Sequence, residues 1–219
     1  ITLMTRADKP VRIGMLGCGV VGSEVARLLL ADTEELSTRA GVKIELSRIA
    51  VRTIKDYPGI NPAIVTTDPF SIVNDPEIDL IVEVMGGIEP ANELAHLAIK
   101  NRKSIVTANK ALLASHGAEL FTAAYAQGED IYYEASVAGA IPIIRPLRDS
   151  LVGDFVIRVM GIVNGTTNYI LTKMHEDNKE FAVALKEAQD LGYAEADPTA
   201  DVEGFDAAAK AAILSGLAF

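Results

Sequence analysis

The sequence has 219 residues, of which 49% are hydrophobic and 5% aromatic, and it has no tryptophan. The core must therefore be mainly aliphatic, which is typical of a buried parallel sheet flanked by helices. The formal net charge of -10 argues against a nucleic-acid partner, because phosphates would be repelled. A single cysteine, Cys18, excludes an internal disulfide framework and fits a reducing compartment.

The sequence predicts neither a membrane span nor a secretory signal. Every long apolar run is interrupted by a charged residue or a glycine. The polar start, residues 1–10, has no apolar signal-peptide core, and Met4 is a candidate native start because Ile1 is not an initiator methionine. We therefore expect a cytoplasmic protein.

Strands and helices alternate in the first part of the chain. Short apolar runs predict strands, and apolar residues at helical spacing predict helices. The expected strands are 11–16, 42–51, 79–85, 104–107 and 131–135, and the expected helices are 23–31, 93–101 and 111–127. This alternation predicts a doubly wound parallel sheet with right-handed crossovers, forming a first domain over residues 1–142.

The pattern changes after Pro142. An apolar strand is expected over 155–163, and helices are expected over 168–176, over 181–191 before Gly192, and from Pro198 to the end. No repeat or Gly/Ser linker separates the two parts. The sequence stops inside an apolar helix, so we expect residues 143–219 to be a truncated second domain.

A glycine-rich turn follows the first expected strand. Residues 17–22 read G-x-G-x-x-G, with glycines at Gly17, Gly19 and Gly22. The first glycine permits a tight turn, the second lets the backbone approach a pyrophosphate, and the third allows the helix to pack on the strand. The pattern alone is weak evidence, but its position between the first strand and the first helix predicts dinucleotide binding.

The end of the second expected strand lacks an acidic residue. A carboxylate there would bind the ribose hydroxyls of NAD, whereas a basic residue can hold the 2′-phosphate of NADP. Arg52, supported by Lys55, is therefore the candidate phosphate-binding residue, and NADP is favoured while NAD stays open. The alternative is that both are solvated charges at a strand exit.

Two further groups of polar residues could carry chemistry. Lys110 follows the strand 104–107, at the sheet end where ligands of doubly wound sheets bind, although an exposed lysine at a helix start is the simpler interpretation.

Asp206 and Lys210 share one face of an expected helix whose other residues are mostly small and apolar. They could form an ordinary surface salt bridge, but charges on a largely buried helix are costly, and a lysine among carboxylates suits proton transfer.

Seven segments together resemble the homoserine dehydrogenases. They are 14–22 (GMLGCGVVG), 82–90 (VEVMGGIEP), 106–113 (VTANKALL), 134–142 (EASVAGAIP), 161–169 (GIVNGTTNY), 192–198 (GYAEADP) and 204–210 (GFDAAAK). Their order and spacing cover nearly the whole chain. The resemblance implies a Rossmann-type domain followed by part of an α+β substrate and dimerisation domain. It also implies the interconversion of L-homoserine and aspartate 4-semialdehyde, in threonine, methionine and isoleucine biosynthesis.

The resemblance also implies residue roles. Lys210 would be the acid/base lysine, and Lys110 would be a second catalytic residue that also contacts the cofactor at the active site. The substrate-binding residues would be Glu195, Asp206 and Gly192, and the dinucleotide would lie against Val20 and Val21. A monovalent cation, usually sodium, would be bound by Glu134 and by the backbone carbonyls of Val137, Gly139 and Ile141.

Complete members of that family continue beyond the position of Phe219, so the chain alone is expected to lack part of the substrate pocket. The resemblance further implies a homodimer formed through the substrate domain. An aspartate-semialdehyde dehydrogenase would need a cysteine nucleophile in its substrate domain, and Cys18 lies instead in the glycine turn. A non-catalytic NAD(P)-binding regulator is the remaining alternative, but it leaves Glu195, Asp206 and Lys210 without a role.

Overall fold

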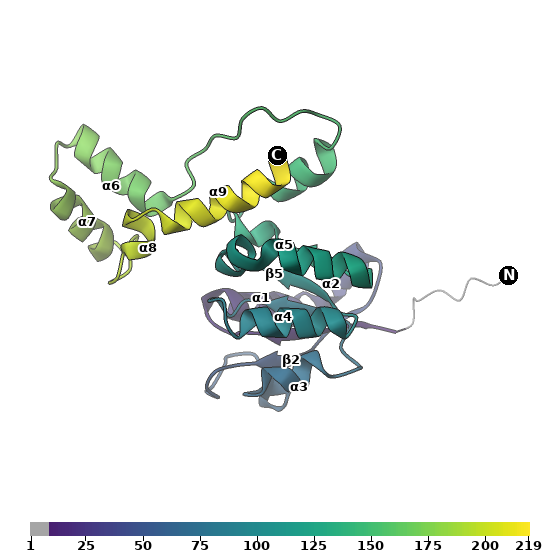
Figure 1. The fold of residues 1–219 in the computed structure, drawn as a ribbon. Helices are drawn as coiled ribbons and strands as arrows, with labels where there is room; N and C mark the ends of the chain where they lie inside the picture. Colours follow the sequence, from purple (N-terminus) through teal and green to yellow (C-terminus); the bar gives the residue numbers. More distant parts are fainter. Residues whose placement is uncertain (1–8) are drawn as a thin grey trace. The chain divides into compact units, whose positions relative to one another are not determined.

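The computed structural model describes residues 9–219, which form two compact units (Figure 1). The first unit ends at Tyr133 and the second begins at Glu134. The boundary expected from the sequence, after Pro142, lies slightly further along the chain. Residues 1–8 of the first expected domain, with the candidate start Met4, lie outside the described residues.

The first unit is built on a six-stranded parallel sheet with the order β3-β2-β1-β4-β5-β6. This is the strand order of the dinucleotide-binding doubly wound fold, in which the connections reverse direction between the first and fourth strands. The expected fold class is therefore confirmed for this unit. The strands are β1 (Val11–Leu16), β2 (Ile44–Ala50), β3 (Val65–Thr66), β4 (Leu80–Glu83), β5 (Ser104–Thr107) and β6 (Ile131–Tyr132).

Helices cover both faces of this sheet: α3, α4 and α5 lie on one face, and α1 and α2 on the other (Figure 1). Their bounds are α1 (Val20–Ala31), α2 (Thr33–Ala40), α3 (Pro69–Val73), α4 (Ala91–Lys100) and α5 (Lys110–Gln127), with a 3-10 turn η2 (Pro62–Ile64) before β3. The core between the layers is aliphatic, as the composition predicts, with Met15, Ile49 and Ile81 at most 1% exposed.

The sequence predicted the longer elements of this unit and missed the short ones. The five expected strands and three expected helices are present with ends shifted by a few residues, and the last strand is limited to Ile131–Tyr132. The helices α2 and α3 and the two-residue strand β3 were not predicted. Elements this short carry too few apolar repeats to show a period.

The second unit is helical over its described residues. It contains α6 (Gly165–Glu176), α7 (Phe181–Asp190), α8 (Thr199–Val202) and α9 (Phe205–Ala218), preceded by a 3-10 turn η3 (Glu134–Ser136) and a π-helical turn η4 (Pro146–Ser150). The last expected helix is in fact two, because Gly204 between α8 and α9 has a left-handed φ of 80°. A small core around Ile170, Ala184 and Ala188 joins α6 to α7.

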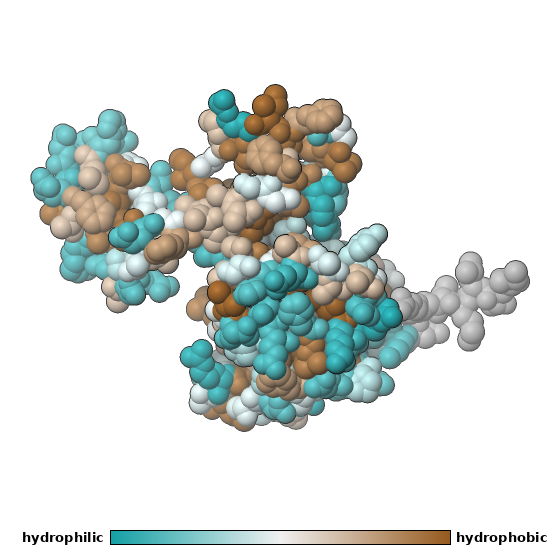
Figure 2. Space-filling view, in the orientation of Figure 1, coloured by the Kyte–Doolittle hydropathy of each residue, from teal (hydrophilic) through white to brown (hydrophobic). Residues whose placement is uncertain are grey.

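The strand expected over 155–163 is not formed, which corrects that prediction. The segment is apolar, but a strand requires a neighbouring strand to pair its backbone groups, and none of the described residues of this unit provides one. Phe155 and Ile157 are 99% and 93% exposed. Much of the visible surface of this unit is accordingly hydrophobic in Figure 2. Among the described helices, none is long and apolar enough to cross a membrane.

Candidate functional site

The glycine turn forms a tight connection between β1 and α1. Gly17 has a φ of 101°, and a Cβ on it would lie 2.7 Å from the carbonyl oxygen of Val84. A Cβ on Gly22 would lie 2.4 Å from the carbonyl oxygen of Gly17, whereas a Cβ on Gly19 would meet no atom within 4 Å. Gly17 and Gly22 are therefore required by packing, and the space over Gly19 is free for a ligand.

The N-terminus of α1 suits an anion. Gly19 is its N-cap and provides no side-chain hydrogen bond, and the first turn of the helix has no acidic residue. Backbone N–H groups and the helix dipole at such an end favour phosphate groups. Val20 and Val21, expected at the dinucleotide, stand in this first turn and are 92% and 55% exposed.

A pocket of about 520 Å³ lies at the carboxyl ends of β1, β2 and β4, where doubly wound folds bind their ligands. Its lining includes Gly17, Gly19, Arg52, Lys55, Met85 and Gly86. The structure thus brings Arg52 and Lys55, both exposed, to the same pocket as the glycine turn. Val20, Val21 and Lys110 are not among its lining residues.

Cys18 lines this pocket as a buried thiol. Burial raises the pKa of Cys18, and the positive charge of Lys55 only partly opposes this effect. A thiol with a raised pKa is protonated at neutral pH and is a poor nucleophile. This agrees with the exclusion of an enzyme that depends on a catalytic cysteine.

Lys110 is the first residue of α5 and lies half-buried at the carboxyl end of β5. The N-cap of this helix is Asn109, whose side-chain oxygen accepts a hydrogen bond from the backbone N–H of Leu112 at 3.1 Å. The cap fixes the position at which Lys110 leaves the sheet. This end of the sheet is the one predicted to meet the cofactor.

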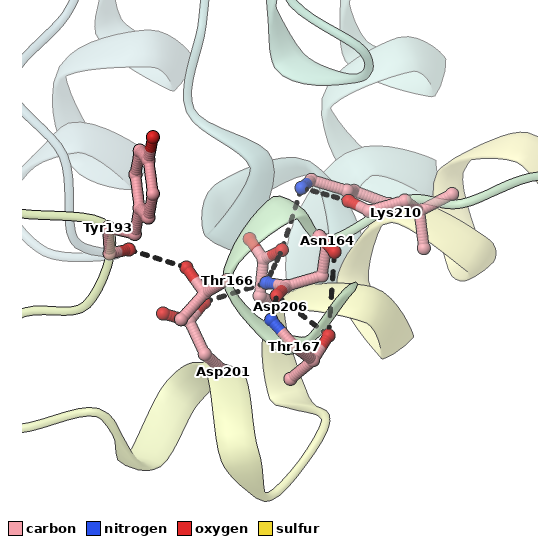
Figure 3. Close-up of polar contacts among 8 residues, drawn as sticks. Asn164, Thr166, Thr167, Tyr193, Asp201, Asp206 and Lys210 are labelled. Carbon is pink, nitrogen blue, oxygen red and sulfur yellow. Dashed lines mark hydrogen bonds and ion pairs between the residues drawn. The ribbon is translucent and has the colours of Figure 1, made fainter. Parts of the chain in front are cut away.

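In the second unit, Asn164 joins two carboxylates (Figure 3). Its side-chain nitrogen donates to Asp201 at 2.7 Å and to Asp206 at 2.8 Å. Its side-chain oxygen accepts from the backbone N–H and the hydroxyl of Thr167, at 2.8 and 2.9 Å, which caps α6. The carboxamide of Asn164 uses all its donors and acceptors and holds the ends of α6, α8 and α9 together.

Lys210 completes this cluster. Its Nζ donates to Asp206 at 2.7 Å and to the carbonyl oxygen of Val163 at 2.5 Å (Figure 3). Asp206 and Lys210 are one turn apart on α9. The alanines between and after them favour the helical conformation. Their side chains are only 7% and 18% exposed, so the pair is not a surface salt bridge. Two carboxylates and one ammonium group leave the cluster with one net negative charge.

These residues line an open cleft of about 610 Å³. The lining includes the predicted residues Gly192, Asp206 and Lys210, together with Asn164, Asp201 and Tyr193. Thr166 donates to the carbonyl oxygen of Tyr193 at 2.7 Å and so holds the turn after α7 against the start of α6. A cleft with one net negative charge and a held ammonium group suits a small ligand that carries an ammonium group and an oxygen to be protonated or deprotonated.

Glu195 is the predicted residue that the structure does not bring to this cleft. It is exposed on the turn before α8, and it is not among the lining residues. Asn164 and Asp201 had no predicted role. Asn164 lies in the segment 161–169 that the sequence singled out, whereas Asp201 falls between the segments 192–198 and 204–210. Asn164 stands four residues before the expected helix 168–176, and the observed helix begins directly after it, at Gly165; asparagine is a favoured N-cap, which is the signal that could have found it.

The expected cation ligands lie on one short loop at the start of the second unit. Glu134 accepts hydrogen bonds from the backbone N–H groups of Ile143 and Ile144, at 2.8 and 3.0 Å, and of Arg145, at 2.9 Å. Ala138 and Ala140 have φ values of 53° and 67°, so the chain that carries the expected carbonyl ligands Val137, Gly139 and Ile141 turns tightly. The carboxylate therefore closes the loop on itself.

Glu134 should make the stability of this loop sensitive to acid. Burial raises the pKa of Glu134, but the three N–H donors and the charge of Arg145 outweigh that effect and leave it below the usual 4.5. A lowered folded-state pKa gives stability that is present above about pH 4.5 and is lost as the pH falls through the lowered value. Glu134→Gln is expected to lower the melting temperature at neutral pH, by an amount that shrinks below pH 4.5.

Thermal unfolding of both proteins at several pH values measures this difference. Glu176→Gln, which changes an exposed carboxylate at the end of α6, is the control. The difference in melting temperature between this variant and the wild type should not shrink below pH 4.5. A gap between wild type and Glu134→Gln that stays constant down to low pH would contradict the assigned cause.

Comparison with known proteins agrees with both units. Residues 17–134 match the NAD-binding domain of homoserine dehydrogenase, and residues 142–219 match the homoserine dehydrogenase family model itself. The chain is 52% identical over 212 residues to the homoserine dehydrogenase of Mycobacterium tuberculosis, covering 97% of the chain and 48% of that protein. The chain spans about half the length of the curated relatives it matches.

Solved structures give the same result. A homoserine dehydrogenase from Thiobacillus denitrificans is 49% identical with a TM-score of 0.90, over 96% of this chain and 49% of that one. A hyperthermophilic archaeal homoserine dehydrogenase solved in complex with NADPH is 29% identical with a TM-score of 0.84, over 96% of this chain and 70% of that one. The chain belongs to the homoserine dehydrogenase family.

Proposed function

We propose that the complete protein interconverts L-homoserine and aspartate 4-semialdehyde with a nicotinamide cofactor. The observation that carries this proposal is the Asp206–Lys210 pair, held by Asn164 in a cleft of the second unit. Family membership supports the same reaction. The cofactor supplies hydride transfer to or from C4 of the substrate, and the residues of the chain bind, orient and move a proton.

In this proposal Lys210 exchanges the proton on the substrate oxygen. Its ammonium group lies between Asp206 and the carbonyl oxygen of Val163, so its position is fixed before a ligand binds. The net negative charge of the cluster attracts the α-ammonium group of the amino-acid substrate. Asp206 and Gly192, which line the cleft, bind that substrate. Glu195 is the third proposed binding residue, although in this structure it lies outside the lining, on the exposed turn that begins at Gly192.

The glycine turn binds the dinucleotide, with the pyrophosphate at the N-terminus of α1 and Val20 and Val21 beside it. The residues fit this group, because the space over Gly19 is free and the helix end has no acidic side chain. Lys110 contacts the cofactor from the start of α5. NADP is the proposed cofactor because two basic residues, Arg52 and Lys55, line the pocket at the end of β2.

We also propose a monovalent cation, sodium, bound by the side chain of Glu134 and the carbonyl groups of Val137, Gly139 and Ile141. An all-oxygen donor set suits a hard cation, and these residues share one tight loop. The same proposal includes a role in threonine, methionine and isoleucine biosynthesis, a homodimer and a cytoplasmic location.

The test is an absorbance assay of the complete protein with L-homoserine and either NADP or NAD. Formation of the reduced cofactor supports the proposed reaction. A folded protein that binds the cofactor but shows no turnover with either nucleotide would instead favour a non-catalytic NAD(P)-binding regulator. Replacing sodium by choline at constant ionic strength tests the cation.

Arg52→Ala tests the cofactor preference. Losing a charge-assisted contact to the 2′-phosphate should raise the Kd for NADPH about 10- to 100-fold and change the Kd for NADH less than about twofold. Fluorescence titration measures both constants. Arg39→Ala, which removes an exposed arginine of α2 paired with Glu35, is the matched control and should change neither. Equal losses for both nucleotides would refute the assignment.

A further inference from the structure

A buried carboxylate of the first unit has no role in the reaction described above. Glu83 is the last residue of β4 and is 1% exposed. Its Oε2 accepts a hydrogen bond from the hydroxyl of Thr107 at 2.6 Å, and its Oε1 accepts from the backbone N–H of Met85 at 2.8 Å. Burying a carboxylate is costly unless such donors compensate it, so this arrangement is a demanding one.

The hydrogen bonds of Glu83 continue into the next loop. Thr107 accepts from the backbone N–H of Asn109 at 3.0 Å, and the side-chain nitrogen of Asn109 lies 3.5 Å from Glu83 Oε1. The same nitrogen donates to the carbonyl oxygen of Gly87 at 2.6 Å, while the side-chain oxygen of Asn109 caps α5. One network therefore ties the loop after β4 to the helix start that carries Lys110.

The loop after β4 forms one wall of the cofactor pocket, through Val84, Met85 and Gly86. Gly86 and Gly87 have left-handed φ values of 74° and 77°. Consecutive glycines have no side chains to hold them and lose much conformational freedom when they are ordered. The hydrogen bonds at Met85 and Gly87 are therefore anchors on either side of Gly86.

The position of this wall indicates which half of the dinucleotide it meets. In doubly wound folds the dinucleotide lies across the point where the strand order reverses, here between β1 and β4. Arg52, at the end of β2, is on the side of the adenosine half. The loop after β4 and the start of α5 are on the other side, that of the nicotinamide half.

We propose that Glu83 is a positioning residue for the nicotinamide half of the cofactor, acting through Met85, Thr107 and Asn109 on the pocket wall and on Lys110. This inference rests on the proposed cofactor binding and is independent of the substrate.

A carboxylate is required at this position because both of its oxygens accept. In Glu83→Gln, an NH₂ group in place of Oε1 would face the N–H of Met85 and could not accept its hydrogen bond. An NH₂ group in place of Oε2 could donate to Thr107 Oγ1 only if the threonine hydroxyl turned its own hydrogen away from Glu83's position. Either orientation therefore leaves one buried donor without the acceptor that it has in the wild type, while the shape of the side chain is kept. The variant therefore loosens the wall without creating a cavity.

The experiment compares two probes on the complete protein. Glu83→Gln is expected to raise the Kd for NADPH about tenfold, and to change the Kd for adenosine 2′,5′-bisphosphate, the adenosine half alone, less than about twofold. Calorimetric or fluorescence titration gives both constants without turnover. General damage to the fold would weaken the binding of both probes. A loss of affinity for NADPH alone therefore distinguishes a positioning role of Glu83 from a merely structural one.

Glu129→Gln is the matched control. Glu129 accepts from the hydroxyl of Ser104 at 2.9 Å, so it is a carboxylate bonded to the same strand β5 at its opposite end. This variant should bind both probes like the wild type. Thr107→Val removes the same bond from the other side and should reproduce the selective loss. Both residues act through one network. The double variant Glu83→Gln/Thr107→Val should therefore bind NADPH with a Kd no higher than that of the more impaired single variant.

Two results would overturn the proposal: wild-type affinity for NADPH in Thr107→Val and in a folded Glu83→Gln, or an equal loss for NADPH and the bisphosphate. Thr107→Val decides the question alone if Glu83→Gln does not fold. A wild-type protein that binds NADPH but does not turn over homoserine would refute the proposed reaction and leave this test intact.

Discussion

Replacing Lys210 by methionine is expected to lower kcat for homoserine oxidation by about 10²- to 10⁴-fold, the usual contribution of a general acid or base, while the Kd for NADPH stays unchanged. Methionine keeps most of the apolar stem of the side chain and removes the ammonium group. Asn164 still donates to Asp206 in the variant, so the cluster keeps one of its links. Steady-state kinetics and NADPH titration of the complete protein measure the two quantities.

Lys186→Met is the matched control for this change. Lys186 and Asp190 form the same one-turn lysine–aspartate pair on α7, but their side chains are 67% and 62% exposed. This variant should keep full activity, because Lys186 does not line the cleft and an exposed pair of this kind contributes little to the stability of the fold. Wild-type kcat in a folded Lys210→Met protein would remove Lys210 as the proton-transfer residue.

Gly22→Ala is expected to lower the free energy of unfolding by about 1–3 kcal/mol, the usual effect of overpacking, and to weaken cofactor binding as a consequence. The added Cβ would lie 2.4 Å from the carbonyl oxygen of Gly17, and a backbone atom in a tight turn cannot move away as a flexible side chain could. Denaturant unfolding and NADPH titration of the same protein measure both effects.

Gly19→Ala should separate these two effects. Its Cβ would meet no atom within 4 Å, so the free energy of unfolding should stay near the wild-type value. The Kd for NADPH should still rise, because this position is where the backbone approaches the pyrophosphate. Unchanged stability in Gly22→Ala, or lost stability in Gly19→Ala, would contradict the roles that the geometry gives the two glycines.

The candidate site was predictable from the sequence where its contacts are local. Asp206 and Lys210 are one helical turn apart, so their spacing alone places them on one face. Asn164 contacts Asp201 and Asp206, which are 37 and 42 residues away, and no local pattern reports such a contact. The same holds for Glu83 and Thr107, which lie 24 residues apart on neighbouring strands.

The segment 155–163 shows a limit of a different kind. Its apolar residues favour a strand, but a strand depends on hydrogen bonds to a second strand, and none is formed within the described part of the chain. Sequence propensity describes what a segment can do with a partner. It does not supply the partner.

By itself, the sequence determined the alternation of strands and helices, the glycine turn and the Asp206–Lys210 pair, because each depends on residues within a few positions of one another. The sequence also placed Arg52 and Lys55 at the strand end beside that turn, and the structure brings them to the same pocket. The tertiary structure alone decided that Asn164 bridges two carboxylates and that Glu195 lies outside the cleft. Such contacts join residues far apart in the chain, and only the packing of whole elements brings them within the few ångströms that a hydrogen bond or a shared pocket requires.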